Sequence, residues 1–143
     1  MSGVCPFWDA GPPWERPQNI QNVKEFWKDF SQKLSEPDKE CVLDSRILRI
    51  MAAELLEAFH QGSEGVNHER GLYGKPWGFS LKDISSKTKV HLWHGKLDVN
   101  VPFTSARTMS SAIPNCKAVF YDGEGHYSAA LNHLEEILRA LTG

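Results

Sequence analysis

The second half of the chain alternates short apolar runs with amphipathic helical patterns, and this alternation constrains the fold more than any other feature. A β-branched run at 89–93 is followed by a helical pattern over 101–113, a second apolar run at 118–121 and a last helical pattern over 131–141. Strand, helix, strand and helix in this order predict two parallel strands joined by a right-handed crossover. The chain is therefore expected to be an α/β protein, with the apolar face of the last helix turned inward.

Two amphipathic patterns precede this alternation. From Asn19, bulky apolar residues recur at three- and four-residue steps, which predicts a helix that ends before Pro37. A second pattern begins near Asp44, a candidate N-cap, and stops at Gly62. Residues 62–80 hold five glycines and no sustained period, so they are predicted to form a connection that leads to the first strand.

Length and composition exclude several classes of protein. With 143 residues, 41% of them hydrophobic, the chain can bury one sizeable core without a disulfide or a structural metal. Its net charge of -2 and pI near 6.3, with both signs mixed along the chain, provide no basic face for nucleic acid. No membrane partner is expected, because no run of eighteen apolar residues and no signal-peptide pattern is present. Three widely spaced cysteines, Cys5, Cys41 and Cys116, favour a reducing compartment, so a cytoplasmic protein is expected.

An acid and a histidine follow the two predicted strands. Asp98 lies in HGKLD, directly after the first strand, and His126 lies in DGEGH, directly after the second. Because the carboxyl ends of neighbouring parallel strands meet at one edge of a sheet, the two side chains are expected to lie in contact. A carboxylate bonded to one imidazole nitrogen fixes the tautomer and leaves the other nitrogen free to act as a general base.

The segments that carry these turns resemble the C-terminal part of an α/β-hydrolase. The resemblance rests on WGFSLKDI (77–84), VHLWHGKLDVNVP (90–102) and AIPNCKAVFYDGEGHYS (112–128). Within them, H-G-x-x-D followed by V-P is similar to the family's acid loop, and G-E-G-H is similar to its histidine loop. By matching position, the resemblance implies that Asp98 is the triad acid and His126 the general base, and it implies no cofactor.

The resemblance also implies a domain organisation. Residues 1–18 would be a loop or the remnant of a strand, residues 19–80 are similar to the helical cap of the family, and residues 81–143 are similar to its C-terminal α/β lobe. The end of the cap resembles the esterase- and peptidase-like branch. The expected fold is thus the C-terminal part of an α/β-hydrolase fold, with two or three parallel strands, flanking helices and a helical cap.

The family's nucleophile is not found in this sequence. Family members carry it in G-x-S-x-G at a strained strand-to-helix turn that precedes the acid and the histidine. No G-x-S-x-G occurs here, and the nearest imitation, Gly62-Ser63-Glu64-Gly65, has the wrong spacing and lies between predicted helices. The resemblance places the backbone donors of the oxyanion hole upstream of this chain as well. The chain is therefore expected to be inactive alone.

Two further sets of side chains are candidates for a site. His91, His94 and His133 are metal-ligand types near Asp98 and His126, but His91 and His94 point to opposite faces of a strand, so no metal site is expected. His94 is instead expected to hydrogen-bond within its own loop.

Aromatic residues near the two turns are candidates to line a substrate pocket, with core packing as the alternative for each. Tyr127, beside the histidine, and Trp77 are the two that we predict to bind substrate.

Two functions from different classes remain open. In the first, the chain is part of a serine hydrolase that, when completed, hydrolyses a small-molecule ester or amide by acyl transfer to water. In the second, it is a non-catalytic α/β-hydrolase-like interaction module. The resemblance implies that neighbouring strands are missing, so an open sheet edge is expected to promote self-association or to bind a partner chain.

Overall fold

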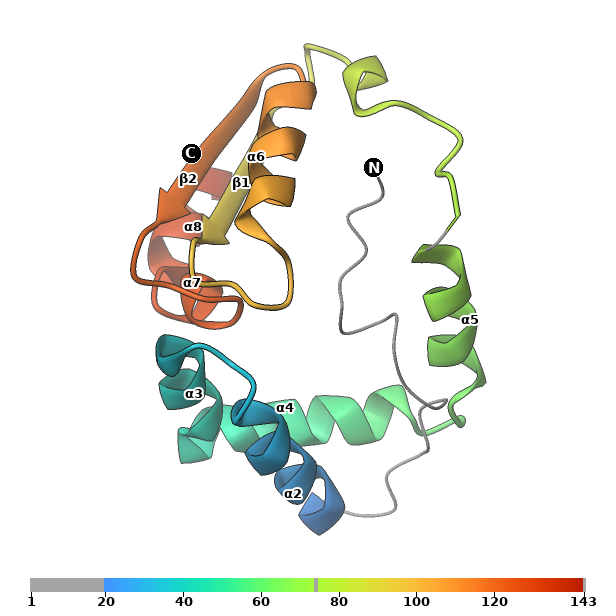
Figure 1. Cartoon of the computed structure of the whole chain (residues 1–143), viewed down its shortest axis with the longest axis vertical. Coiled ribbons are helices and arrows are strands. Elements are labelled where there is room, and N and C mark those ends of the chain that lie inside the picture. Colours follow the sequence, from blue (N-terminus) through green and yellow to red (C-terminus); the bar gives the residue numbers. More distant parts are fainter. Residues whose placement is uncertain (1–19, 74, 143) are drawn as a thin grey trace.

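The computed structural model describes residues 20–73 and 75–142 (Figure 1). The predicted loop or strand remnant at 1–18 lies outside the described residues. The elements follow in the order α2 (Ile20–Ser31), α3 (Glu36–Leu43), α4 (Ser45–Ala58), α5 (Glu64–Tyr73), the 3-10 turn η1 (Leu81–Asp83), β1 (Val90–Gly95), α6 (Phe103–Ala112), β2 (Cys116–Tyr121), α7 (Ser128–Leu131) and α8 (Leu134–Thr142).

The predicted α/β architecture is confirmed. In the described part of the chain, β1 and β2 form a parallel two-stranded sheet whose register runs from Val90 opposite Cys116 to Gly95 opposite Tyr121. Helix α6 connects the two strands and packs against both. Both strands therefore end at the same edge of the sheet, where α7 also lies (Figure 1).

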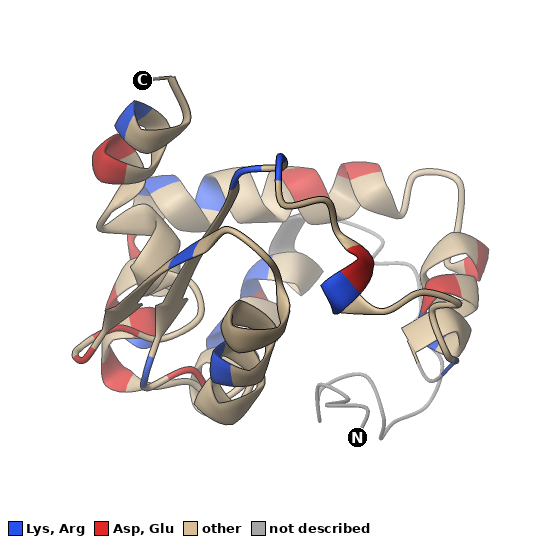
Figure 2. Ribbon diagram, turned by 90° about the horizontal axis from the view of Figure 1, so that it is seen from above, with Lys and Arg blue, Asp and Glu red and all other residues tan. Residues whose placement is uncertain are grey.

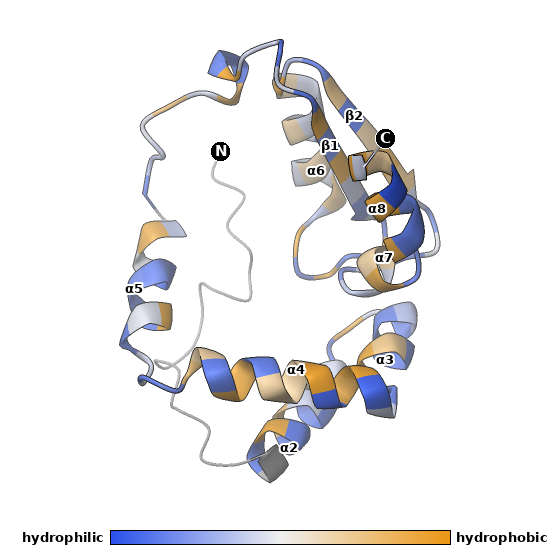
Figure 3. Ribbon diagram, turned by 180° about the vertical axis from the view of Figure 1, so that it is seen from behind, coloured by the Kyte–Doolittle hydropathy of each residue, from blue (hydrophilic) through white to orange (hydrophobic). Residues whose placement is uncertain are grey.

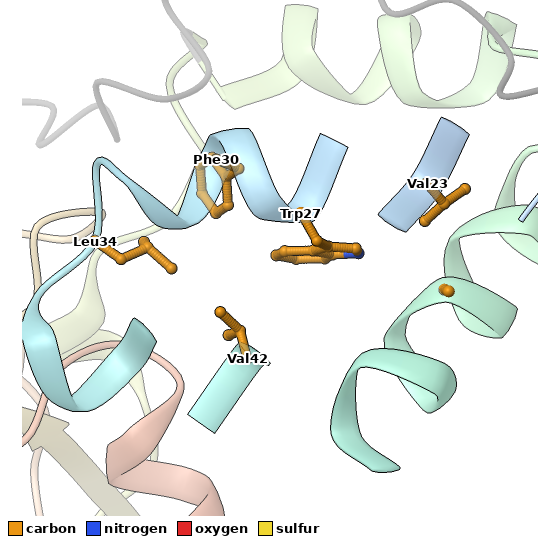
Figure 4. Close-up of a cluster of buried hydrophobic side chains, with 6 residues drawn as sticks. Val23, Trp27, Phe30, Leu34 and Val42 are labelled. Carbon is orange, nitrogen blue, oxygen red and sulfur yellow. The ribbon is translucent and has the colours of Figure 1, made fainter. Parts of the chain in front are cut away.

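The first three helices form a layer with its own hydrophobic core. Helix α2 packs against α3 and α4, and their buried side chains are Val23, Trp27, Phe30, Leu34, Val42 and Ala52 (Figure 4). The predicted N-cap of α4 is confirmed, because Asp44 Oδ1 accepts hydrogen bonds from the backbone N–H groups of Arg46 (2.9 Å) and Ile47 (3.3 Å).

Helix α3 was not expected from the sequence. The first amphipathic pattern ends before Pro37, as predicted, but the proline then stands in the first turn of a new helix. A proline fits there because its fixed φ suits the helix and its missing N–H would have no partner in the first turn. Pro37 was thus correctly predicted to lie beyond the end of the first helix, but its place in the first turn of α3 was not predicted.

Helix α5 corrects the prediction that residues 62–80 are only a connection. The helix carries Glu64 in its first turn and Arg70 in its last, where each charge complements the helix dipole. None of its residues is buried, so its formation does not rest on an apolar face packed against another element. From α5 the chain continues to η1 and β1 on the far side from the α2–α4 layer (Figure 1).

The last helical pattern also differs from its prediction. It is divided into α7 and α8 at Asn132 and His133, and the apolar face of α8 is not covered by the described residues: Leu134, Leu138 and Leu141 are 50%, 52% and 63% exposed. Figure 1 and Figure 3 show α8 and α6 on opposite sides of the two strands. Among the described elements α8 packs chiefly against the short helix α7, so its leucines lack a covering surface.

Charged side chains of both signs are distributed over the helices and loops (Figure 2). Of the described helices, none combines the length and the apolar character needed to cross a bilayer.

Candidate functional site

Asp98 is held in place by the loop that follows β1. Its Oδ1 accepts hydrogen bonds from the backbone N–H groups of Asn100 and Val101, both at 2.8 Å, and the residue is only 8% exposed. An aspartate that bonds the backbone two and three residues ahead is a common way to fix a turn. The second oxygen, Oδ2, is left to face the next loop of the same sheet edge.

His126 occupies that next loop, after β2. Its Nδ1 lies 2.8 Å from Asp98 Oδ2, a distance at which Nδ1–H donates a hydrogen bond to the carboxylate. The loops also meet through the backbone, where the N–H of Leu97 donates to the carbonyl of Glu124 at 2.9 Å. Gly95 permits this approach, because a Cβ there would overlap the carbonyl oxygens of Glu124 and Gly125.

The contact shifts both pKa values in the direction that favours an ion pair. Burial by itself would raise the pKa of Asp98, but the hydrogen bonds from His126 and from the N–H of Val101 outweigh it, so the pKa is lowered. The hydrogen bond to Asp98 raises the pKa of His126 against the opposing effect of burial, and the charges of Asp98 and Asp38 add to it. The imidazole is thus a stronger base than a free histidine.

The remaining ring nitrogen of His126 is available. The His126 side chain is 38% exposed, and within residues 20–73 and 75–142 its Nε2 has no hydrogen-bond partner. A cavity of about 320 Å³ adjoins the pair, and its lining includes Trp93, His94, Asp98, His126, Ala129 and Ile137. A buried carboxylate, an oriented imidazole and a free basic nitrogen beside a cavity are the parts that general-base catalysis requires.

The two aromatic residues predicted to bind substrate lie in different places. Tyr127 packs edge-on against His126, with ring centroids 5.0 Å apart, and against Trp27 of the helical core at 5.8 Å. Trp77 lies between α5 and η1, is 62% exposed and has Phe79 as its ring neighbour at 5.8 Å. The structure brings Tyr127 to the histidine but places neither aromatic in the lining of the cavity.

The other histidines have further partners, although His94 Nε2 also lies 3.7 Å from Asp98 Oδ2. His94 Nε2 lies 3.2 Å from the carbonyl oxygen of Val101, which confirms the expected bond within its loop. His133 contacts Glu124 at 3.3 Å and stacks on Tyr121, and His91 stacks on Trp93. Within the described ranges, no group of three or more His, Cys, Asp or Glu side chains is arranged to hold a metal ion.

Ser63, the nearest imitation of the missing nucleophile, lies directly before α5, outside the lining of the cavity. The serine closest to the histidine in sequence is Ser128, which is fully buried and accepts a hydrogen bond from the N–H of Gly125 at 2.7 Å. In the described part of the chain, no hydroxyl or thiol is hydrogen-bonded to His126.

Sequence reasoning missed Asp38, which lies in α3 and is completely buried. Its carboxylate accepts hydrogen bonds from the backbone N–H groups of His126 (2.8 Å), Tyr127 (2.8 Å) and Ser128 (2.9 Å). The spacing of Ser35 and Asp38 resembles a helix capping box, in which the acid would bond the backbone of its own N-cap. That pattern points to a local role, whereas the backbone amides that Asp38 binds are distant in sequence.

The comparisons with known proteins give a structural likeness and no match in sequence. No protein-family model matches the sequence, and no curated protein matches it significantly. Among solved structures, an esterase from Exiguobacterium antarcticum is similar to this chain with a TM-score of 0.48 and 21% identity, over 87% of this chain and 42% of the esterase. The chain thus spans less than half the length of that esterase.

Proposed function

We propose that this chain supplies the acid and the base of a serine-hydrolase triad, with Asp98 and His126 in these roles, and that the nucleophile comes from a segment or a chain outside these residues. Completed in this way, the protein would hydrolyse an ester or an amide of a small molecule by acyl transfer to water. The resemblance to the C-terminal part of an α/β-hydrolase supports the class of reaction.

One observation carries the proposal: the 2.8 Å contact between buried Asp98 Oδ2 and Nδ1 of a half-exposed His126, whose Nε2 has no hydrogen-bond partner among the described residues. In the proposed reaction, Nε2 accepts the proton of the attacking hydroxyl while the hydroxyl oxygen bonds to the substrate carbonyl carbon. The Asp98 carboxylate stabilises the imidazolium that forms. The same proton then passes to the leaving group, and a water molecule repeats the two steps on the acyl intermediate.

Complementation tests this function. The chain is mixed with a separately expressed N-terminal part of an α/β-hydrolase that carries G-x-S-x-G, and hydrolysis of p-nitrophenyl acetate is followed. We expect activity in the mixture, none in the chain alone, and loss of activity with His126→Gln. His68→Gln, which alters an exposed histidine of α5, is the matched control and should leave the activity unchanged. Activity that survives His126→Gln would contradict the proposal.

A second candidate function is a non-catalytic interaction module, and the exposed leucines of α8 favour it. Leu134, Leu138 and Leu141 lie on one face of a helix that the described residues leave uncovered. An apolar face of this kind, together with an open sheet edge, would support self-association or a partner chain. No gain of hydrolysis on mixing, together with stable self-association measured by light scattering, would favour this function.

The proposed compartment is the cytoplasm. Cys41 and Cys116, the two cysteines in the described residues, are free thiols, which supports a reducing environment.

A further inference from the structure

The buried carboxylate of Asp38 joins two parts of the molecule that are distant in sequence. Oδ1 accepts the N–H groups of Tyr127 and Ser128, and Oδ2 accepts the N–H of His126 and the hydroxyl of Ser35, the last at 3.0 Å. Four donors therefore satisfy both carboxylate oxygens. Three of them are successive backbone amides of the histidine loop, 88 to 90 residues away.

Burial of the Asp38 carboxylate destabilises the fold unless its hydrogen bonds are formed. A buried carboxylate without hydrogen-bond partners would pay a large desolvation penalty, so Asp38 stabilises the fold only while all the amides face it. The reverse also holds, because the amides of His126, Tyr127 and Ser128 donate to this carboxylate and would lose that acceptor without Asp38. Carboxylate and loop thus fix each other.

The loop is shaped to receive the carboxylate. A Cβ on Gly125 would overlap both Asp38 Oδ2 and Ser35 Oγ, so only glycine allows α3 to approach so closely. A second contact crosses the same junction, where Cys41 Sγ of α3 lies 3.5 Å from Asn132 Oδ1, just after α7. Figure 1 shows α3 directly beside α7 at this point.

We infer that Asp38 is a positioning residue for the general base, an inference that rests on the function proposed above. By binding the amides of His126, Tyr127 and Ser128, it fixes the backbone from which the imidazole extends to Asp98. It does not touch the cavity and takes no part in proton transfer. The helical layer thereby holds the base of the α/β lobe in place.

The test uses nuclear magnetic resonance on the full chain. Asp38→Asn is compared with Glu40→Gln, which removes an exposed carboxylate from the same helix. We expect Asp38→Asn to abolish the downfield proton resonance of the His126 Nδ1–H. We also expect amide exchange at His126, Tyr127 and Ser128 to accelerate by about tenfold or more, the factor that a loss of about 1.4 kcal/mol produces. Glu40→Gln should change neither quantity.

Retention of the resonance and of wild-type exchange rates in a folded Asp38→Asn protein would overturn the inference. If Asp38→Asn unfolds the whole chain, so that the amides of β1 lose protection too, Gly125→Ala becomes the deciding variant. Its methyl group displaces the carboxylate without altering Asp38, and the same loss of the resonance is expected. Gly123→Ala, whose Cβ would meet no atom within 4 Å, is its control. A wild-type resonance in Gly125→Ala would likewise overturn the inference.

These measurements need no nucleophile, so they separate the inference from the proposed function. In the complemented enzyme, Asp38→Asn is expected to lower kcat by about tenfold and leave KM within about twofold, because the change misplaces the base and not the substrate. If the wild-type mixture hydrolyses no ester while Asp38→Asn still loses the resonance, only the proposed function fails. If the mixture is active and Asp38→Asn retains full kcat and the resonance, only the inference fails.

Discussion

Replacing Asp98 with asparagine tests the physical basis of the site. The change is isosteric, so Oδ1 of the new amide can still accept the N–H groups of Asn100 and Val101 at the positions seen here. The amide NH2 then faces His126 Nδ1, which now lies opposite a donor instead of the carboxylate Oδ2. The imidazole can restore this bond only by accepting at Nδ1, which moves its proton to Nε2. We therefore expect the neutral ring to change tautomer.

The loss of stability follows from the three bonds that the carboxylate accepts. A hydrogen bond to a charged group contributes about 1.5 to 3 kcal/mol, against about 0.5 to 1.5 kcal/mol for a neutral one, so each bond weakens by about 1 kcal/mol. Burying a neutral amide costs less than burying a carboxylate, which offsets part of this loss. The expected decrease in the free energy of unfolding is about 1 to 3 kcal/mol, and for a chain of this length it lowers Tm by about 3 to 10 °C.

Thermal unfolding and the 15N chemical shifts of the His126 ring measure the two effects separately. The pKa of His126 should also fall, because the hydrogen bond to Asp98 is the largest cause of its elevation. Asp122→Asn is the matched control, since Asp122 is an exposed aspartate of the neighbouring histidine loop that pairs with Lys96. An Asp98→Asn protein with wild-type Tm and a proton still on Nδ1 would refute the reasoning.

Two further predictions concern pH and the close approach of the loops. The pKa of His126 is raised on folding, so its charged form stabilises the fold below the unfolded pKa of about 6.5, and this contribution is lost as pH rises through the folded pKa. The free energy of unfolding should thus differ between wild type and His126→Gln more at about pH 6 than at about pH 9 in urea titrations, and equal differences would contradict the pairing. Gly95→Ala should lower the free energy of unfolding by about 1 to 3 kcal/mol, because its Cβ would overlap two carbonyl oxygens, while Gly123→Ala should not. Equal unfolding curves for the two glycine variants would show that the loops do not meet as described.

The sequence predicted the acid–histidine contact because the rule behind it is topological. Once β1 and β2 are parallel, the residues that follow them lie at one edge, and Asp98 and His126 each stand within a short loop of that edge. No knowledge of packing was needed. The bond of His94 within its own loop was predicted on a different ground, as the alternative to a metal site.

The sequence could not predict elements whose stability depends on distant partners. Helix α3 has a low share of apolar residues, and its fully buried polar residue, Asp38, is satisfied by amides of the histidine loop. Contacts between residues 38 and 126 leave no periodic pattern, so propensity and spacing do not reveal them. The exposure of Leu138 was not predicted either. The sequence of α8 shows that the helix has an apolar face but not whether another element covers that face.

The acid and the base of the site are fixed by different kinds of contact. Asp98 is held by amides two and three residues away in its own loop, so its position depends on local structure. His126 is held by Asp38, so its position depends on the packing of the helical layer against the α/β lobe. Contacts between distant residues are lost more readily in partial unfolding than contacts within a turn. A perturbation that loosens α3 should therefore disorder the base while the acid loop remains formed, and amide exchange would then be faster at His126 than at Val101.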